Sequence, residues 1–261
     1  MQAKPGFALK LMLAAALCCG CMQYAGATMV TVAGTLFDVQ YDDAQLNPSS
    51  GQFSLFGAPT ISGSNVIFRP NNLFAQSSSG GLVGVPATFN LAIVPRSGLQ
   101  LQVSGLSLTE LGDFSLAGNG SYVNVGGQLI AYDPANFISY TTSNLAMVAP
   151  ANTANTVTSP PGAQNVNWIA QAAINSSANP SPFANPAGVN VVLENQLQAF
   201  APTSDPNSFA FIQKKVAGDT VTLTVVSQVP VPAAGLLFAS GFLGLIGMAR
   251  RRGRSNSRIF A

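Results

Sequence analysis

The feature that most limits the fold is a series of short segments between residues 99 and 132 in which apolar and polar side chains alternate. Leu99, Leu101 and Val103 are separated by glutamines, and strand-like patterns recur at residues 106–116 and 122–132. Asn and Gly fall at residues 118–120 and 126–127, where they favour turns. Short strands at this spacing predict an all-β fold, an antiparallel β-sandwich with jelly-roll-like topology.

Further strands are expected on both sides of this region. A hairpin is predicted from residues 209–214 and 220–226, joined across residues 216–219. The other predicted strands cover residues 29–41, 52–56, 65–68, 87–94, 189–193 and 196–200.

One short helix is predicted as an insertion into this β-domain. Apolar residues follow the i, i+3, i+4, i+7, i+8 rule of an amphipathic helix between residues 166 and 174, around the single tryptophan, Trp168. The positions on this face are Val166, Ile169, Ala170, Ala173 and Ile174. The flanking residues 152–161 and 176–186 are rich in Pro, Asn and Ser, so we expect loops there.

The N-terminal residues 1–27 have the layout of a secretory signal peptide. Lys4 and Lys10 precede an apolar run at residues 11–17, and Ala25-Gly26-Ala27 provides small residues at a cleavage site. Cleavage after Ala27 would leave Thr28 as the first residue of the mature protein. A lipoprotein signal is the alternative, with the lipid on Cys18, Cys19 or Cys21.

The C-terminal residues 229–261 combine a proline motif, an apolar segment and a basic tail. Residues 233–249 are apolar, and as a helix they would extend about 26 Å. This is close to the ~30 Å of a bilayer core, so a transmembrane helix is predicted. The basic tail, residues 250–261, opens with Arg250, Arg251 and Arg252, which would stop transfer on the cytoplasmic side.

This tail resembles a PEP-CTERM sorting signal. The motif Val229-Pro230-Val231-Pro232-Ala233 is similar to the Val-Pro-Leu-Pro-Ala variant of that signal, although Val231 replaces the family's glutamate. The resemblance implies an exported bacterial protein that is processed by exosortase, a membrane transpeptidase, and is associated with extracellular polysaccharide or biofilm. It covers the tail alone. An ordinary single-pass membrane anchor is the alternative.

Residues 28–228 form the predicted exported domain, and their composition excludes several classes of function. Four basic residues stand against nine acidic ones in this range, a net charge of −5, so no basic patch for nucleic acid is expected. All three cysteines lie before residue 28, which predicts a fold without disulfides. The chain has no histidine, which excludes Ser-His-Asp catalysis and histidine-ligated zinc.

Carboxylate chemistry is the remaining route to an enzyme. Glu110 and Asp113 are close in sequence, and a glycosidase needs two carboxyl groups. Gly112 lies between them, so the alternative is a turn in which both carboxylates cap backbone N–H groups. Asp42-Asp43 is a second acidic pair, for which calcium binding or a solvated turn is possible. We expect no catalytic residue, no metal and no cofactor.

Two other groups of side chains have a functional and a structural interpretation. Lys214 and Lys215 are expected at a solvated strand edge, where charge discourages aggregation. Aromatic residues could form a platform on which sugar rings stack, or they could belong to the core. The residues concerned are Trp168, Tyr122, Tyr132 and Tyr140.

The sequence therefore predicts an exported, non-enzymatic surface or extracellular-matrix protein. It would be anchored transiently in the inner membrane by its C-terminal helix and then be periplasmic, at the cell surface or extracellular. A carbohydrate-binding module is the first alternative, and a carboxylate-based glycoside hydrolase is the second.

Overall fold

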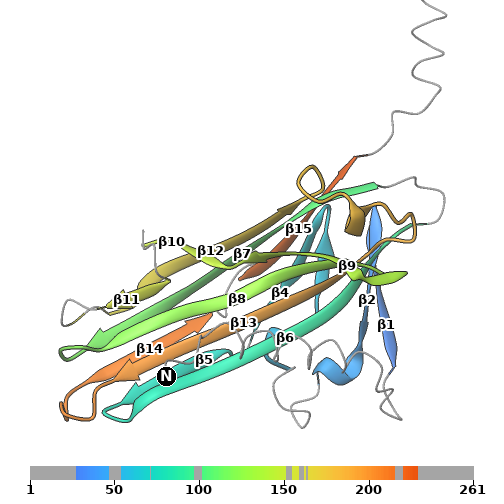
Figure 1. The fold of residues 1–261 in the computed structure, drawn as a ribbon. Helices are drawn as coiled ribbons and strands as arrows, with labels where there is room; N and C mark the ends of the chain where they lie inside the picture. The colour runs from blue at the N-terminus through green and yellow to red at the C-terminus, as the bar shows by residue number, and fades with distance from the viewer. Residues whose placement is uncertain are drawn as a thin grey trace, which may run out of the picture.

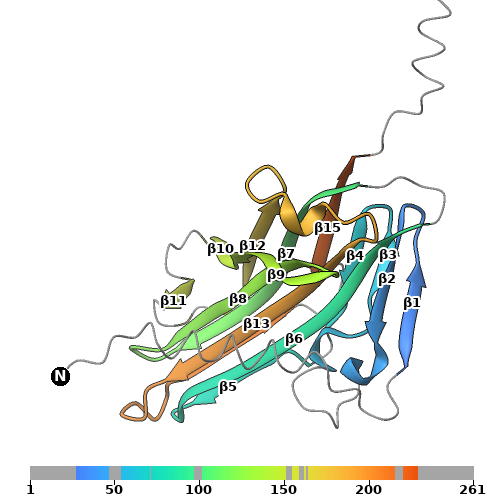
Figure 2. The ribbon, with the colours of Figure 1, turned by 45° about the vertical axis from the view of Figure 1, so that its right-hand side comes forward.

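The computed structural model describes residues 28–228, except 47–53, 71, 97–101, 151–154, 159–161, 163 and 215–219. This part of the chain is all-β, with antiparallel sheets and no α-helix. Two sheets pack face to face, as Figures 1 and 2 show from two directions, which is a β-sandwich-like arrangement. The predicted signal peptide and the predicted C-terminal helix lie outside the described residues.

The first sheet follows the order β1-β2-β6-β13-β8-β11, and β9 also pairs with β8. Its long central strands, β6, β13 and β8, pair antiparallel over most of their length. The strands are β1 (Met29–Ala33), β2 (Phe37–Asp42), β6 (Gly81–Pro95), β8 (Tyr122–Asp133), β9 (Asn136–Asn144), β11 (Thr156–Thr158) and β13 (Val189–Ala201).

The second sheet follows the order β10-β12-β7-β15-β4-β3, while β14 pairs with both β5 and β7. Its strands are β3 (Thr60–Ser62), β4 (Asn65–Phe68), β5 (Phe74–Ser78), β7 (Gln102–Ala117), β10 (Ala146–Ala149), β12 (Val166–Asn175), β14 (Phe209–Lys214) and β15 (Val221–Gln228). Three single-turn 3-10 helices, η2 (Asp43–Leu46), η4 (Ser54–Phe56) and η5 (Ser181–Phe183), complete the elements of the described residues.

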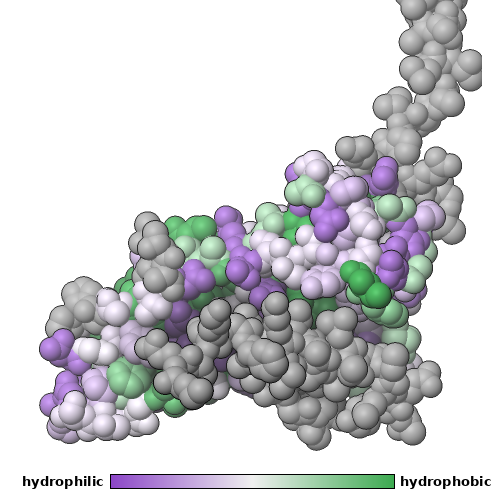
Figure 3. Space-filling model, viewed as in Figure 1, coloured by the Kyte–Doolittle hydropathy of each residue, from purple (hydrophilic) through white to green (hydrophobic). Residues whose placement is uncertain are grey.

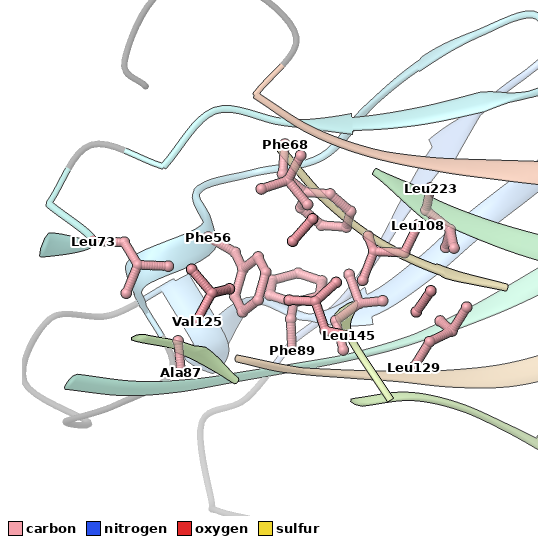
Figure 4. Packing of buried hydrophobic residues seen from close by; sticks show 14 of the residues in the cluster. Phe56, Phe68, Leu73, Ala87, Phe89, Leu108, Val125, Leu129, Leu145 and Leu223 are labelled. Carbon is pink, nitrogen blue, oxygen red and sulfur yellow. The ribbon is translucent and has the colours of Figure 1, made fainter. Parts of the chain in front are cut away.

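Alternation along the strands builds the core between the sheets. Buried residues occupy every second position over most of β7 and β13, as a strand with one face on the core requires. Phe56, Phe68 and Phe89 meet in the middle of this core, with ring centroids 5.1 to 6.0 Å apart (Figure 4). Tyr41 joins the cluster through Phe89, at 5.5 Å.

The predicted helix at residues 166–174 is wrong, because these residues form strand β12. Trp168, Ala170, Ala172 and Ile174 are buried at every second position. β12 pairs with β7 over its whole length, so its backbone hydrogen bonds are made between strands. The apolar positions of this short segment fit both the period of a helix, about 3.6 residues, and that of a strand, two residues. Only pairing with the neighbouring edge of β7 decides between them.

Several predicted strand limits are also corrected. Residues 29–41 form two strands, β1 and β2, which reverse near Gly34 and pair with each other. Gly126-Gly127 is not a turn, because β8 continues through it, and residues 189–201 form one strand instead of two. Residues 54–56, within the predicted strand 52–56, form the 3-10 helix η4.

The predicted hairpin of residues 209–214 and 220–226 is wrong as well. β14 pairs with residues 112–117 of β7, and β15 pairs with residues 102–110 of the same strand. The two strands therefore lie one after the other along one edge of β7. Lys214, the last residue of β14, comes directly before the break between them.

Candidate functional site

Three polar side chains meet inside the apolar core. Glu110, Asn195 and Lys214 are exposed by 0, 3 and 1 %. Glu110 and Lys214 come from β7 and β14 of one sheet, whereas Asn195 comes from β13 of the other. We call these three residues the core polar cluster, and it spans the space between the sheets.

One carboxylate oxygen connects the cluster. Glu110 Oε2 lies 2.5 Å from Lys214 Nζ, and it accepts a hydrogen bond of 2.5 Å from Asn195 Nδ2. Since both nitrogens lie this close to the same oxygen, they cannot be further apart than twice that distance. The amine and the side-chain amide are therefore neighbours.

The cluster leaves polar atoms unsatisfied. Glu110 Oε1 and Asn195 Oδ1 are buried and have no hydrogen-bond partner. Lys214 Nζ forms an ion pair with Glu110 Oε2, but it makes no hydrogen bond. Buried polar groups without partners are rare and destabilising, so this arrangement requires a specific explanation.

Beyond the other two residues of the core polar cluster, an aromatic ring lies near the Lys214 amine. Its Nζ lies 5.5 Å from the centroid of the Phe56 ring. In the second sheet, Lys214 of β14 pairs with Gly112 of β7. On its other side, Gly112 pairs with Trp168 of β12. Burial lowers the pKa of Lys214, although the negative charge of Glu110 opposes this shift.

The prediction that Lys214 lies at a solvated edge is wrong. The sheet registers place Lys214 next to Gly112, and its side chain is buried with Glu110 as its partner. Lys215 lies outside the described residues. A lysine in a sequence is usually solvated, and the signal that this one is buried is its place in the alternation Ala210, Ile212, Lys214.

Glu110 and Asp113 do not form a catalytic pair. Both lie within strand β7, and their odd sequence separation places them on opposite faces of the sheet. Glu110 faces the core, while Asp113 accepts hydrogen bonds of 3.0 and 3.3 Å from Gln213 Nε2 on the outer face. The predicted turn around Gly112 is likewise replaced by strand.

Asp42 and Asp43 bind backbone groups. Asp42 accepts a hydrogen bond of 2.8 Å from the Ala44 amide, and Asp43 accepts one of 2.8 Å from the amide of Thr28. Within the described ranges, no three His, Cys, Asp or Glu residues are grouped in a way that could hold a metal ion.

The predicted aromatic platform is divided between distant places. Trp168 is fully buried and its indole N–H donates to the Gln213 carbonyl at 3.1 Å, so the tryptophan cannot take part. Tyr122 stacks on Phe200, at the opposite end of β8 from Tyr132. Tyr132 and Tyr140 are register partners on β8 and β9, so these two side chains share one face.

The surface of the described residues offers little other chemistry. A hollow of about 240 Å³ beside Ser115, Asn165 and Phe209 has no titratable side chain in its lining. Figure 3 shows one face of the molecule, where hydrophilic residues (purple) and hydrophobic residues (green) are interspersed among weakly coloured ones. In the part of the chain that the structure describes, no helix is long and apolar enough to cross a bilayer.

Comparisons with known proteins assign no family. No protein-family model matches the sequence, and no curated protein matches it significantly. One solved structure, of the infectious bursal disease virus Gx strain, aligns with 85% of this chain and 58% of its own, at 10% identity and a TM-score of 0.14. The chain thus spans less than two thirds of that protein, and a similarity this weak carries no argument.

Proposed function

We propose that this chain is an exported, non-enzymatic surface or extracellular-matrix protein that is sorted through its C-terminal signal. The observation that carries the proposal is the position of β15. This strand ends at Gln228, directly before the motif Val229–Ala233, and it pairs with β7 on one side and β4 on the other. Residues 221–224 of β15 lie between β4 and β7, whereas residues 225–228, next to the sorting segment, pair with β7 alone. A force applied to the sorting segment would thus act first on a strand end that is hydrogen-bonded to β7.

The start of the domain fits the same proposal. The amide nitrogen of Thr28 donates to Asp43 Oδ1 at 2.8 Å, and the Thr28 carbonyl accepts from the Asp43 amide at 3.0 Å. If signal cleavage occurs after Ala27, this nitrogen becomes a charged α-ammonium group beside a carboxylate. Such a charge-assisted pair is stronger than a neutral hydrogen bond, so a mature chain that begins at Thr28 would be stabilised at its first residue.

The proposed partners follow from the resemblance of residues 229–261 to a sorting signal. They are an exosortase-like transpeptidase and, transiently, the inner membrane, with polysaccharide at the final location. That location is periplasmic, at the cell surface or extracellular. A jelly-roll-like topology belongs to the same proposal, since the chain passes between the two sheets from β5 to β6, from β6 to β7 and from β7 to β8.

Substitutions in the tail test sorting in the native host. Replacing Pro230 and Pro232 by alanine should leave the protein in the membrane but prevent its release into the medium. Replacing Arg250, Arg251 and Arg252 by glutamine should instead abolish membrane retention, because nothing would then stop translocation. Fractionation followed by immunoblotting measures both effects. A wild-type chain that stays full-length and membrane-bound would contradict sorting and favour the plain anchor.

A carbohydrate-binding module is the second candidate, and one aromatic surface favours it. Tyr132 and Tyr140 lie side by side, and the Tyr132 ring is 5.6 Å from that of Phe137. Phe137 and Tyr140 are 57 and 43 % exposed, so their faces can reach a sugar ring. Asp133, hydrogen-bonded to Asn185 at 2.7 Å, adds polar groups at the same end of β8.

A glycan array separates the two candidates. The wild-type chain should bind a polysaccharide if this surface is a sugar site, and Tyr140→Ala should lose the binding. Tyr122→Ala, at the far end of β8, is the matched control and should retain it. An array without any hit for the wild type would leave the non-binding surface protein as the better candidate.

A further inference from the structure

The core polar cluster contains the three groups that an amide-forming reaction needs. Lys214 supplies an amine, Asn195 supplies a side-chain carboxamide, and Glu110 lies between them with one oxygen 2.5 Å from each nitrogen. All three are nine-tenths buried or more. An ion pair that served stability alone would be expected to satisfy its remaining polar atoms, and this cluster does not.

Desolvation makes the amine reactive. The side chain of Lys214 has no exposed surface, and the Phe56 ring lies beside its ammonium position. A lysine taken out of water is more easily neutral, and a neutral amine is a nucleophile. The adjacent Glu110 carboxylate can accept the proton that the amine releases, as a general base within hydrogen-bond distance would.

We propose that Lys214 and Asn195 join spontaneously in an intramolecular isopeptide bond, with Glu110 as the group that moves the protons. The reaction begins when Lys214 passes one proton to Glu110, so that the amine and the carboxyl group are both neutral. Nζ then attacks Cγ of Asn195, and a Nζ–Cγ bond forms. Glu110 donates its proton to Nδ2 and takes one from Nζ, the Cγ–Nδ2 bond breaks, and Nδ2 leaves as ammonia.

The product explains the unsatisfied atoms. The new amide keeps one N–H at Nζ, which can donate to Glu110. Because the lysine amine has become a neutral amide, the buried positive charge is gone. Glu110 ends the reaction protonated, and its O–H can donate to the amide oxygen that was Asn195 Oδ1. Each of the three atoms without a hydrogen bond before the reaction thus has a partner afterwards.

The bond would join the two sheets covalently, close to the strand that leads to the sorting segment. It would link β13 of one sheet to β14 of the other, and Lys214 is the last residue before the break that precedes β15. A cross-link stabilises a fold by restricting the unfolded chain, as a disulfide does. A domain without cysteine after residue 27 has no disulfide available for this purpose.

Mass and fragment analysis of the full-length chain tests the proposal. The wild-type chain, purified from the membrane fraction of the cells that express it, should be lighter by one ammonia than the mass calculated for the sequence between its observed first and last residues. Dilute acid cleaves Asp–Pro bonds, which the chain has at Asp133-Pro134 and Asp205-Pro206. Under denaturing conditions, the fragment 134–205 should remain joined to the fragment that starts at Pro206.

The fragment analysis also excludes a different source of the same mass loss. Cyclisation of an asparagine onto its own backbone releases ammonia too, but it leaves the two fragments separate. A wild-type chain that yields separate fragments would overturn the proposal, whatever its mass. This measurement needs no variant, so it does not depend on whether a variant folds.

Three variants identify the groups involved. Glu110→Gln keeps the size of the side chain but cannot relay protons. This variant should therefore show no loss of ammonia, and its fragment 134–205 should separate from the fragment that starts at Pro206. Lys214→Met should do the same because it lacks the amine. Lys215→Arg, at the neighbouring position, is the matched control and should stay cross-linked. A cross-link that survives in Lys214→Met would also overturn the assignment.

Discussion

The indole ring of Trp168 lies in the space that a side chain at Gly112 would occupy. The two residues are register partners on β12 and β7, and a Cβ at Gly112 would overlap Trp168 and the backbone oxygen of Gln213. The absence of a side chain at Gly112 thus lets a tryptophan enter the core beside Lys214.

We therefore expect Gly112→Ala to destabilise the domain by about 1–3 kcal/mol or more, since neither the ring nor the backbone can yield easily. Gly126→Ala is the control, because its Cβ would come no closer than 3.8 Å to any atom of residues outside its immediate chain neighbours. Urea unfolding, followed by the fluorescence of Trp168, measures both. Equal midpoints for the two variants would contradict the packing.

The ring cluster around Phe89 gives a second prediction. Phe89 is fully buried, and its ring meets those of Tyr41, Phe56 and Phe68. Phe89→Ala should lower the free energy of unfolding by about 3–5 kcal/mol, through lost burial and the cavity that it leaves. Phe137→Ala, at a ring that is 57 % exposed, should change it by less than about 0.5 kcal/mol. Chemical denaturation compares the two.

Two acidic residues, Glu194 and Asp133, should change the free energy of unfolding with pH in opposite directions. Burial raises the pKa of Glu194, so the folded state holds its proton more tightly and this group costs stability as pH rises through the folded pKa. Glu194→Gln should therefore stabilise the protein at pH 7. The gain should vanish below the unfolded pKa of about 4.5, where both states are protonated.

Asp133 is the matched contrast to Glu194. Hydrogen bonds from Asn185 and from the Ala135 amide lower its pKa, so it contributes stability above the unfolded value and loses it as pH falls through the folded pKa. Asp133→Asn should be destabilising at pH 7 and neutral in strong acid. Thermal unfolding of both variants between pH 2 and 7 is the measurement, and shifts of the same sign would contradict the assignment.

Processing of the N-terminus gives a further prediction. If Thr28 is the first residue of the mature protein, its ammonium group pairs with Asp43, which accepts the hydrogen bond from the Thr28 nitrogen. Asp43→Asn should then destabilise the processed chain by up to about 1 kcal/mol, the range of an exposed ion pair. It should matter less in a chain that still has residues 1–27. N-terminal sequencing checks the cleavage, and a lipid on Cys18, Cys19 or Cys21 would refute it.

The sequence by itself determined that residues 28–228 form β-structure, and the reason is local. A strand with one face on the core must alternate, so residues 102–117 and 122–133 show the period of two without reference to any other part of the chain. The exact match of residues 209–214 to a predicted strand has the same origin, whereas residues 65–68 are a short apolar run with three consecutive buried residues. The predicted strand limits were wrong at Gly126-Gly127. The sequence favours a turn there, whereas β8 continues through both residues.

Tertiary structure alone decided which residues share the core, because that depends on partners far away along the chain. Residues 166–175 fit a helix or a strand equally well, and the free edge of β7 makes them a strand. Lys214 would be solvated by its residue type, and its burial follows from Glu110 on β7 and Asn195 on β13. Glu110 and Asn195 are 85 residues apart, and no local pattern of charge or hydropathy reports that two such side chains will meet.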